Sequence, residues 1–145
     1  MNKLALLAGA ALLTLSSLSF AASLQSLNKS QVTHEVQGKT ITTIPLVTLN
    51  DQLITNTFTG FFDKNGELKG QLANKPDNGP QTDSGKWQVK ADGTLCATWQ
   101  HWNQSKPVCI SVFRLQNGLI FINQQNRKLE TVILDDSIKS GNQLS

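Results

Sequence analysis

The sequence predicts a mainly β, antiparallel domain with one short helix at its start. Three observations lead to this prediction. Short runs rich in β-branched and aromatic residues recur between residues 39 and 134. Stretches of Gly, Asn, Asp and Pro separate these runs, and no helical crossover follows residue 38. Because parallel strands need crossovers, about seven or eight strands joined by short turns are expected to form an antiparallel meander.

The number and length of the predicted strands favour a small barrel-like sheet, similar to a lipocalin, or a strongly curved sheet. Both arrangements reduce the length of exposed strand edge. A β-sandwich is the alternative architecture. In the barrel-like arrangement, the N-terminal helix is placed to plug one end.

Residues 1–21 have the features of a secretory signal peptide. Lys3 precedes an uncharged apolar stretch, and small residues surround the expected cleavage site near Ala21 or Ala22. The apolar stretch is short for a membrane span, and no cysteine near the cleavage site is available for lipid attachment. The sequence therefore predicts a periplasmic or secreted protein whose single β-rich domain covers residues 22–145, with no membrane span after cleavage.

A short amphipathic helix is predicted over residues 29–37. Val32 and Val36 recur at helical spacing, and a glycine follows in the position typical of a helix C-terminus. Asn28 or Ser30 is expected to cap the first turn, because side-chain oxygens of these residue types accept hydrogen bonds from free helical amides.

Strands are predicted over the rest of the chain. Their expected ranges are residues 39–44, 53–62, 67–72, 86–90, 94–99, 108–115, 119–124 and 129–134. Asp63–Gly66 predicts a hairpin turn, and Asn117-Gly118 predicts a hairpin of the type I′ class. Residues 73–85 contain many turn formers and are predicted to be a loop.

Cys96 and Cys109 are the only cysteines, and both follow the predicted cleavage site. Each lies in a β-like run, and the turn-rich segment His101–Pro107 separates the two runs. A hairpin centred near Trp102-Asn103 would place Cys96 opposite Cys109. In an oxidising compartment such a pair predicts a disulfide, which would contribute about 3 kcal/mol by restricting the unfolded chain.

The segment that contains the cysteines also carries a recognisable pattern. Gly85-Lys86-Trp87, Asp92–Trp99 and Pro107-Val108-Cys109 together read G-x-W, D-G-x-L-C-x-x-W and C. This pattern resembles a family of small exported bacterial proteins defined as a domain of unknown function. Two upstream strings, Gly38-Lys39-Thr40 and Gly60–Asp63, are also similar to that family. The resemblance implies an extracytoplasmic β-rich domain and implies no particular activity.

Composition and charge exclude several classes of protein. The chain has 39% hydrophobic and 16% charged residues, which is too apolar for a disordered chain. A net charge of +3 without a basic cluster excludes a nucleic-acid partner. His34, His101 and the two cysteines have no metal-ligand spacing, and the Asp63–Glu67 string lacks the remaining calcium ligands. No phosphate-binding motif is present, so no cofactor or metal is predicted.

The hairpin between the cysteines holds the best candidate binding residues. Trp102 lies there with His101, Asn103 and Gln104, and Trp99 ends the preceding strand. An exposed aromatic ring beside amides suits stacking on a sugar or anchoring in a protein partner. The alternative for Trp102 is a ring folded back over the mouth of the barrel, and for Trp99 it is a place in the core.

Two functions are therefore predicted. The first is an exported binding protein for a protein, glycan or small ligand outside the cytoplasm, since amides and hydroxyls dominate the polar residues. The alternative is a secreted hydrolase of envelope or extracellular polymers that uses His101 with Asp92 or Asp83. No G-x-S-x-G string or other nucleophile signature supports the hydrolase.

Overall fold

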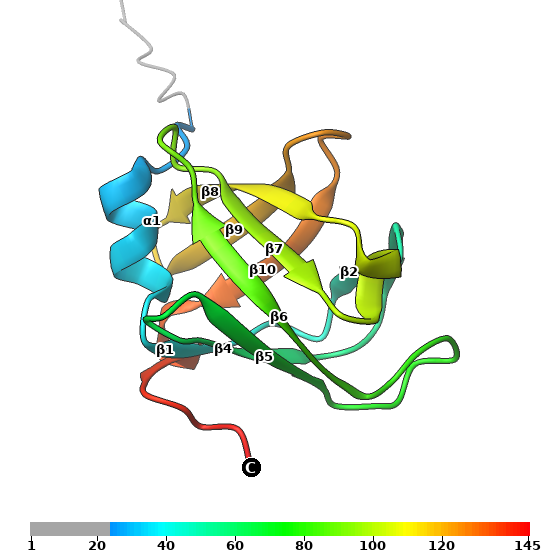
Figure 1. The fold of residues 1–145 in the computed structure, drawn as a ribbon. Coiled ribbons are helices and arrows are strands. Elements are labelled where there is room, and N and C mark those ends of the chain that lie inside the picture. The colour runs from blue at the N-terminus through cyan, green and yellow to red at the C-terminus, as the bar shows by residue number, and fades with distance from the viewer. Residues whose placement is uncertain (1–23) are drawn as a thin grey trace, which may run out of the picture.

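A computed structural model describes residues 24–145 as one curved antiparallel sheet with a single α-helix (Figure 1). The predicted signal peptide, residues 1–21, lies outside the described residues. Within residues 24–145, no helix is long and apolar enough to cross a membrane. The elements, in chain order, are α1 (Lys29–Val36), β1 (Lys39–Thr42), β2 (Val47–Leu49), β3 (Gln52–Ile54), β4 (Phe58–Phe62), β5 (Glu67–Leu72), β6 (Thr82–Val89), β7 (Leu95–Trp99), η1 (Trp102–Ser105), β8 (Val108–Leu115), β9 (Gly118–Asn123), β10 (Leu129–Leu134), η2 (Asp135–Ser137) and β11 (Ile138–Ser140).

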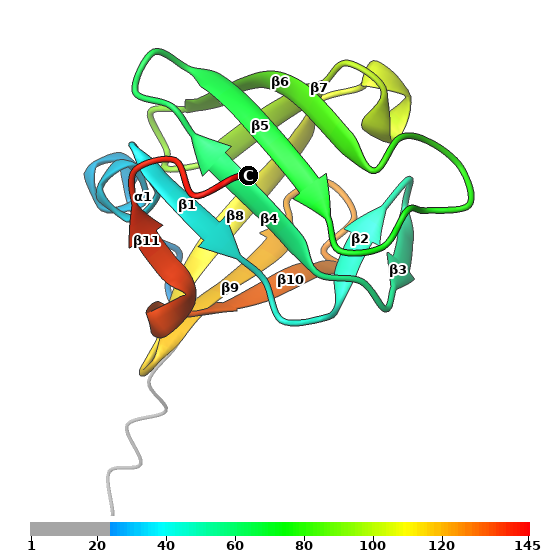
Figure 2. The same cartoon turned by 90° about the horizontal axis from the view of Figure 1, so that it is seen from below.

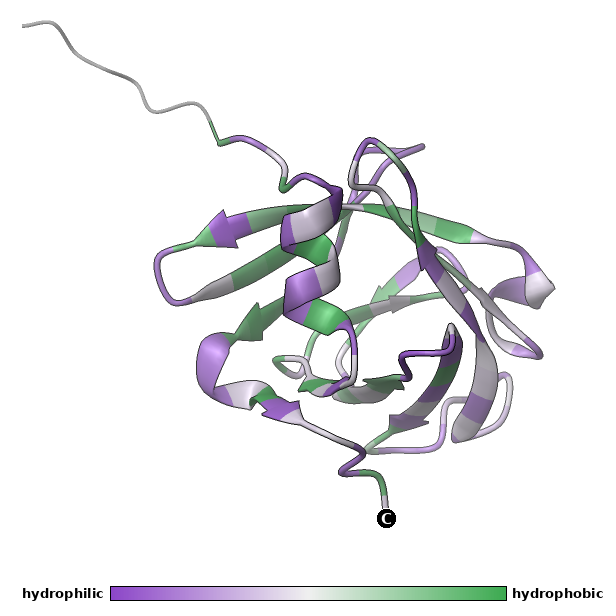
Figure 3. Cartoon of the chain, turned by 60° about the vertical axis from the view of Figure 1, so that its left-hand side comes forward, coloured by the Kyte–Doolittle hydropathy of each residue, from purple (hydrophilic) through white to green (hydrophobic). Residues whose placement is uncertain are grey.

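The helix forms where the sequence predicts it, and Asn28 is its cap. The Asn28 side chain accepts a hydrogen bond from the Gln31 amide at 3.0 Å, and the Gln31 side chain accepts one from the Asn28 amide at 2.9 Å. Val32 and Val36 are fully buried. Figure 3 shows that α1 lies across one end of the curved sheet. The helix therefore covers this end, as the barrel-like arrangement predicted.

The mainly β prediction is confirmed, and the sheet is curved but not closed. Its strand order is β11-β1-β4-β5-β6-β7-β8-β9-β10-β2-β3, with antiparallel pairing throughout. Strands β4 to β10 follow one another as a meander. The sheet curls until its two halves approach, and the Ile44 amide donates a 3.0 Å hydrogen bond to the Val132 carbonyl. Figure 2 shows the resulting concave interior from a second direction.

The structure has eleven strands instead of the predicted seven or eight. The predicted strand over residues 53–62 is two strands, β3 and β4. Asn56 separates them, because its buried side chain bonds to the backbone of Asn74 at 2.9 and 3.2 Å. The three-residue strand β11 pairs with β1, which is distant in sequence, and the three-residue strand β2 forms a local hairpin with β3 and pairs with the distant β10 at one position. Three residues are too few to show the alternation that predicts a strand.

Two local predictions are corrected. The loop predicted over residues 73–85 ends earlier, because Thr82–Gly85 already belong to β6 and pair with β5. Backbone pairing with β5 makes residues 82–85 a strand, and their mostly polar side chains give no strand pattern in the sequence. The hairpin predicted at Asn117-Gly118 is present between β8 and β9, but neither residue has a positive φ, so the type I′ prediction is wrong.

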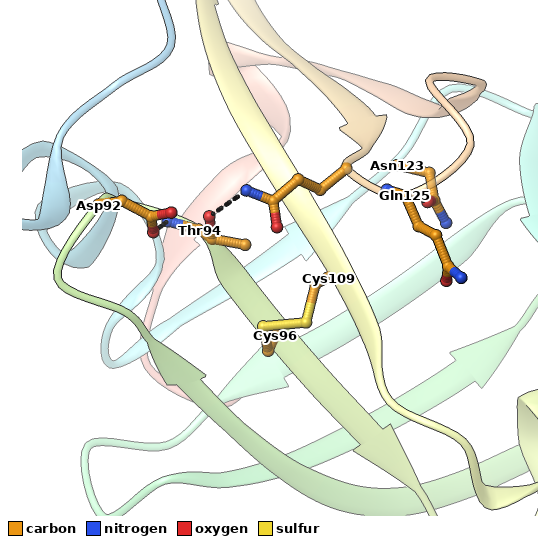
Figure 4. Close-up of a disulfide and its surroundings, with 7 residues drawn as sticks. Asp92, Thr94, Cys96, Cys109, Asn123 and Gln125 are labelled. Carbon is orange, nitrogen blue, oxygen red and sulfur yellow. Dashed lines mark hydrogen bonds between the residues drawn. A yellow bond between two sulfur atoms is a disulfide. The ribbon is translucent and has the colours of Figure 1, made fainter.

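The predicted disulfide is confirmed. Cys96 on β7 lies directly opposite Cys109 on β8, with Cα atoms 4.1 Å apart, and a disulfide joins them (Figure 4). Leu95, Ala97 and Trp99 alternate with Cys96 along β7 and face the interior. The disulfide therefore lies on the outer face of the sheet, where it fixes the β7–β8 register without occupying the interior.

The connections between strands gather at two ends of the molecule (Figure 1). The helix end holds α1 and the β4–β5, β6–β7 and β8–β9 turns. The η1 end holds the β7–β8 connection with η1, the β2–β3 hairpin, and the β5–β6 and β9–β10 loops. The core fills the space between the two ends on the concave face of the sheet.

Candidate functional site

The concave face of the sheet encloses a cavity of about 100 Å³ that opens to solvent. Most of its lining is aliphatic and aromatic. The polar lining residues are Thr43, Thr48, Asn103, Glu130 and Thr131. Val108 and Ile110 line the cavity and are only half-buried, which indicates that β8 borders the opening. A mostly apolar concavity with a few polar groups is typical of small-ligand sites.

Three aromatic rings form one wall of the cavity, and we call Phe58, Trp99 and Trp102 the aromatic cluster. The Trp99 and Trp102 ring centroids are 4.7 Å apart, and Phe58 lies 5.8 Å from Trp99 and 6.2 Å from Trp102 in edge-on arrangements. The rings pack onto Gly70 of β5, where an added Cβ would lie 2.6 to 2.7 Å from all three. Gly70 therefore provides the room that the cluster needs.

Trp102 is not the exposed anchor that one sequence interpretation proposed. Its side chain is 2% exposed, and its indole nitrogen donates a 2.8 Å hydrogen bond to the Pro80 carbonyl. The ring is folded back into the concave interior, as the alternative interpretation predicted. Trp99 likewise lines the cavity from the end of β7. Both tryptophans are therefore available to a ligand in the cavity and not to a partner at the hairpin tip.

Asp83 holds the start of the η1 turn in place. One of its carboxylate oxygens accepts hydrogen bonds from the amides of His101 and Trp102, both at 2.8 Å. The other oxygen lies 2.9 Å from Nδ1 of His101. Burial alone would raise the pKa of Asp83, but the Trp102 amide, the His101 ring and the remaining amide donors lower it below its usual value.

His101 therefore has one of its two predicted carboxylate partners. It pairs with Asp83, whereas Asp92 lies in the β6–β7 turn at the helix end and accepts a 2.9 Å bond from the Thr94 amide. That local bond also holds the pKa of Asp92 below its usual value. Within residues 24–145, no Ser, Thr or Cys side chain bonds to the His101 ring. The arrangement is an Asp–His pair without a positioned nucleophile.

Asn103, one of the two predicted amide residues, bonds to the neighbouring β2–β3 hairpin and is not free at the hairpin tip. Asn103, Gln104 and Ser105 have positive φ angles of 55°, 57° and 58°. The Asn103 side chain accepts a 2.8 Å bond from the Asn50 amide, and the Asn50 side chain accepts one of 2.8 Å from the Asn103 amide. This reciprocal pair ties η1 to the β2–β3 hairpin beside the cavity. Gln104 remains exposed.

Glu130 was not predicted from the sequence. It lines the cavity with 8% of its surface exposed, and it accepts a 2.8 Å bond from the Asn123 side chain. Burial raises the pKa of Glu130, the Asn123 bond opposes this, and the charge of Asp51 adds to the rise. Simple alternation along β10 would place Glu130 on the outer face with Val132. The sequence therefore carries no signal of its inward position.

Within the described residues, no group of three or more His, Cys, Asp or Glu side chains could hold a metal ion. In comparisons with known proteins, no family model, no curated protein and no solved structure matches this chain. The resemblance to the family of small exported bacterial proteins therefore stays a prediction.

Proposed function

We propose that this chain is an exported binding protein that holds a small, largely apolar ligand in the cavity on the concave face of its sheet. The observation that carries this proposal is the cavity wall built by the aromatic cluster of Phe58, Trp99 and Trp102. An engineered apolar cavity of about 150 Å³ is enough to bind benzene in another protein. The present cavity is smaller, about 100 Å³, but it opens to solvent, so a short alkyl chain or a single ring can extend into the opening.

The exported location rests on two sequence features. Residues 1–21 have the pattern of a signal peptide, and disulfides such as Cys96–Cys109 persist in oxidising compartments. The ligand would then be met in the periplasm or outside the cell.

A small ligand is favoured over a protein or glycan at the hairpin tip by the position of the tryptophans. The hot-spot role proposed for Trp102 requires an accessible ring, and this ring is 2% exposed with its indole nitrogen bonded to Pro80. Of the predicted binding residues, His101 and Gln104 remain exposed, and they provide little apolar area. Binding energy is more readily gained inside the concavity, where apolar surface faces the opening.

Titration with hexanol tests the proposal. Binding is expected to change the tryptophan fluorescence and to shift backbone NMR signals of Ala97, Val108 and Ile133, which line the cavity, while signals of α1 stay unchanged. Unchanged cavity signals at saturating hexanol would contradict the proposal.

A matched pair of variants localises the binding. Val108→Phe fills the opening from a half-buried, inward-facing position and is expected to abolish hexanol binding. Thr98→Phe adds the same ring on the exposed outer face of β7 and is expected to leave binding intact. Thermal unfolding of both variants checks that they fold. Equal binding by the two variants would remove the cavity from consideration.

The Asp83–His101 pair supports a second candidate function, the secreted hydrolase. A surface hollow beside the pair is lined by polar residues that include Thr82 and Ser84, so a hydroxyl lies in the same region. The test compares His101→Ala with the wild-type protein on ester, glycoside and peptide substrates. Loss of turnover in a folded variant would favour the hydrolase, and turnover that is absent or unchanged would exclude this pair.

A further inference from the structure

Glu130 faces the cavity because β10 contains a β-bulge. The pairing of β10 with β9 shifts between Leu129 and Thr131, which leaves Glu130 as the extra residue. As a result, Glu130 and Thr131 both line the cavity although they are adjacent in sequence. Bulges of this kind redirect a side chain, and they are frequent next to functional sites.

The environment of Glu130 lacks a counter-charge. It is the one charged residue in the cavity lining, which contains no Lys, Arg or His among the described residues. Asn123 donates to Oε1, whereas Oε2 has no donor among the described residues and is not fully buried. Burial raises the pKa of this carboxyl, as expected for an acid in an apolar setting. A carboxylate held in this way is costly unless another group compensates its charge.

A purely structural role of Glu130 would not require its negative charge. The Glu130 carboxylate orients the Asn123 amide, whose oxygen accepts bonds from the amides of Gln125 at 2.9 Å and Asn126 at 3.1 Å in the β9–β10 loop. A glutamine at position 130 would offer a neutral oxygen to the same Asn123 donor. The negative charge therefore has no use within this loop.

The residues that line the cavity are suited to a cationic group that would neutralise Glu130. The aromatic cluster can hold an apolar body, and the faces of its rings also attract cations. Asp51 lies close enough to Glu130 to influence it, so the electrostatic potential around the carboxylate is negative. A ligand with an ammonium group would provide both the counter-charge and the hydrogen-bond donor that Glu130 lacks.

We infer that Glu130 anchors the head group of a small primary amine whose apolar body occupies the cavity. This inference rests on the proposed function, because it names the ligand class for the same cavity. The ammonium group would bond to Oε2 of Glu130, and the alkyl or aryl part would lie against Phe58, Trp99 and Trp102. A hydroxyl or a carboxylate in place of the ammonium would lose the charge pairing or add repulsion.

Three probes of equal chain length test the inference at neutral pH: hexylammonium, hexanol and hexanoate. Tryptophan fluorescence and NMR titrations would measure their dissociation constants. The wild-type protein is expected to bind hexylammonium about tenfold more tightly than hexanol, since a charge-assisted bond replaces a neutral one, and to bind hexanoate most weakly. In Glu130→Gln the preference for hexylammonium over hexanol should disappear while hexanol binding remains.

Two controls make the result specific. Asp51→Asn removes an exposed charge near Glu130 and is expected to reduce the hexylammonium preference less than twofold. The NMR signals of Gln125 and Asn126 report whether the loop of Glu130→Gln keeps its structure. If this loop changes, Glu130→Asp, which keeps the charge, serves as the second variant and should retain a preference for the amine over hexanol.

Each outcome separates the two proposals. If wild-type protein binds hexanol and hexylammonium equally, or if Glu130→Gln keeps the preference, the anchor role of Glu130 is wrong while the cavity remains a ligand site. If hexanol and hexylammonium both fail to bind, the proposed function is overturned together with the anchor.

Discussion

The two ends of the molecule reach left-handed backbone conformations in different ways. At the helix end, the described residues with positive φ are glycines: Gly38, Gly66, Gly93 and Gly141. At the η1 end, they include six residues with side chains, namely Asn50, Asp51, Asn103, Gln104, Ser105 and Arg127. Glycine adopts this conformation at little cost, whereas most other residues pay roughly 1–2 kcal/mol each.

Tertiary hydrogen bonds hold the conformation of the η1 end. Asp83 binds the amides of His101 and Trp102, and Asn50 and Asn103 bind each other's backbone. The helix end also has tertiary contacts, since Arg114 of β8 pairs with Glu35 of α1 and with Asp135, but its positive-φ positions are glycines that need no such support. The strained end is also the end that borders the cavity, in line with the tendency of backbone strain to collect at functional sites.

The largest expected change in stability is at Asp83 of the η1 end, and Asp92 of the helix end provides the comparison. Asp83→Ala should lower the free energy of unfolding by about 3 kcal/mol, because the buried amide of Trp102 and the partly buried amide of His101 lose their acceptor. Asp92→Ala, at an exposed turn, should have a much smaller effect. Urea unfolding at neutral pH measures both. Equal losses would mean that the η1 end does not depend on Asp83 more than an ordinary turn depends on its aspartate.

The contribution of Asp83 should also depend on pH. Its pKa is lowered in the folded protein, so the folded state binds this proton less strongly than the unfolded state. The stabilisation is therefore complete above the unfolded pKa and is lost as the pH falls through the lowered folded pKa. The difference between wild type and Asp83→Ala should shrink across that acidic window in a series of urea titrations.

Gly70→Ala should lower the free energy of unfolding by about 2 kcal/mol. The added methyl group would lie 2.6 to 2.7 Å from Phe58, Trp99 and Trp102, so the aromatic cluster would have to shift. Near-ultraviolet circular dichroism should change with the stability, because the tryptophans move. Lys69→Ala, at the exposed neighbouring position, is the control and should be close to neutral. An unchanged tryptophan spectrum in Gly70→Ala would contradict this packing.

Exchanging the residue types of the two ends tests the strain directly. Gln104→Gly should raise the free energy of unfolding by about 1 kcal/mol, since its φ of 57° then carries no side-chain penalty. Gly66→Ala should lower it by about 1 kcal/mol at a φ of 87°, with the nearest atom to the added Cβ at 3.4 Å. Chemical denaturation gives both values. Destabilisation by Gln104→Gly would show that its side chain contributes more than the strain costs.

The smallest expected effect concerns Glu130. Glu130→Gln should raise the free energy of unfolding by about 1 kcal/mol or less at neutral pH, because it removes a buried charge and keeps an acceptor for Asn123. The pKa of Glu130 is raised in the folded protein, so wild-type stability falls as the pH rises from the unfolded pKa through the folded pKa. The advantage of the variant should grow over this window and vanish at lower pH. Destabilisation at neutral pH would mean that the carboxylate is needed for the fold.

Local chemistry made much of the fold predictable. The Asn28 cap, the spacing of Val32 and Val36, and the Cys96–Cys109 pairing are all confirmed, because each depends on neighbours in sequence or on one hairpin register. The seven-strand meander follows from short turns in the same way. The sequence did not predict β11 because its partner β1 is about 100 residues away, and it did not predict β2 because this strand has only three residues, paired with β3 in a tight hairpin and with β10 at one position.

The candidate site was only partly predictable. The sequence identified Trp99 and the residues His101–Gln104, but it could not decide whether Trp102 points outward or into the interior. That choice depends on Asp83 of the neighbouring strand β6 and Pro80 of the β5–β6 loop, which bond to the Trp102 backbone amide and indole. In the same way, the Asp92 alternative for His101 failed because Asp92 lies at the other end of the molecule.

The sequence by itself determined the class of fold, the helix, the central meander and the disulfide, because hydrophobic periodicity, turn residues and caps act over a few positions. Only the tertiary structure decided where the cavity lies, that Trp102 is part of its wall, and that Glu130 enters it. The physical reason is that a one-residue bulge reverses the face of a side chain, and the curling of an open sheet brings strands together that are distant in sequence. Neither event leaves a periodic pattern in the chain.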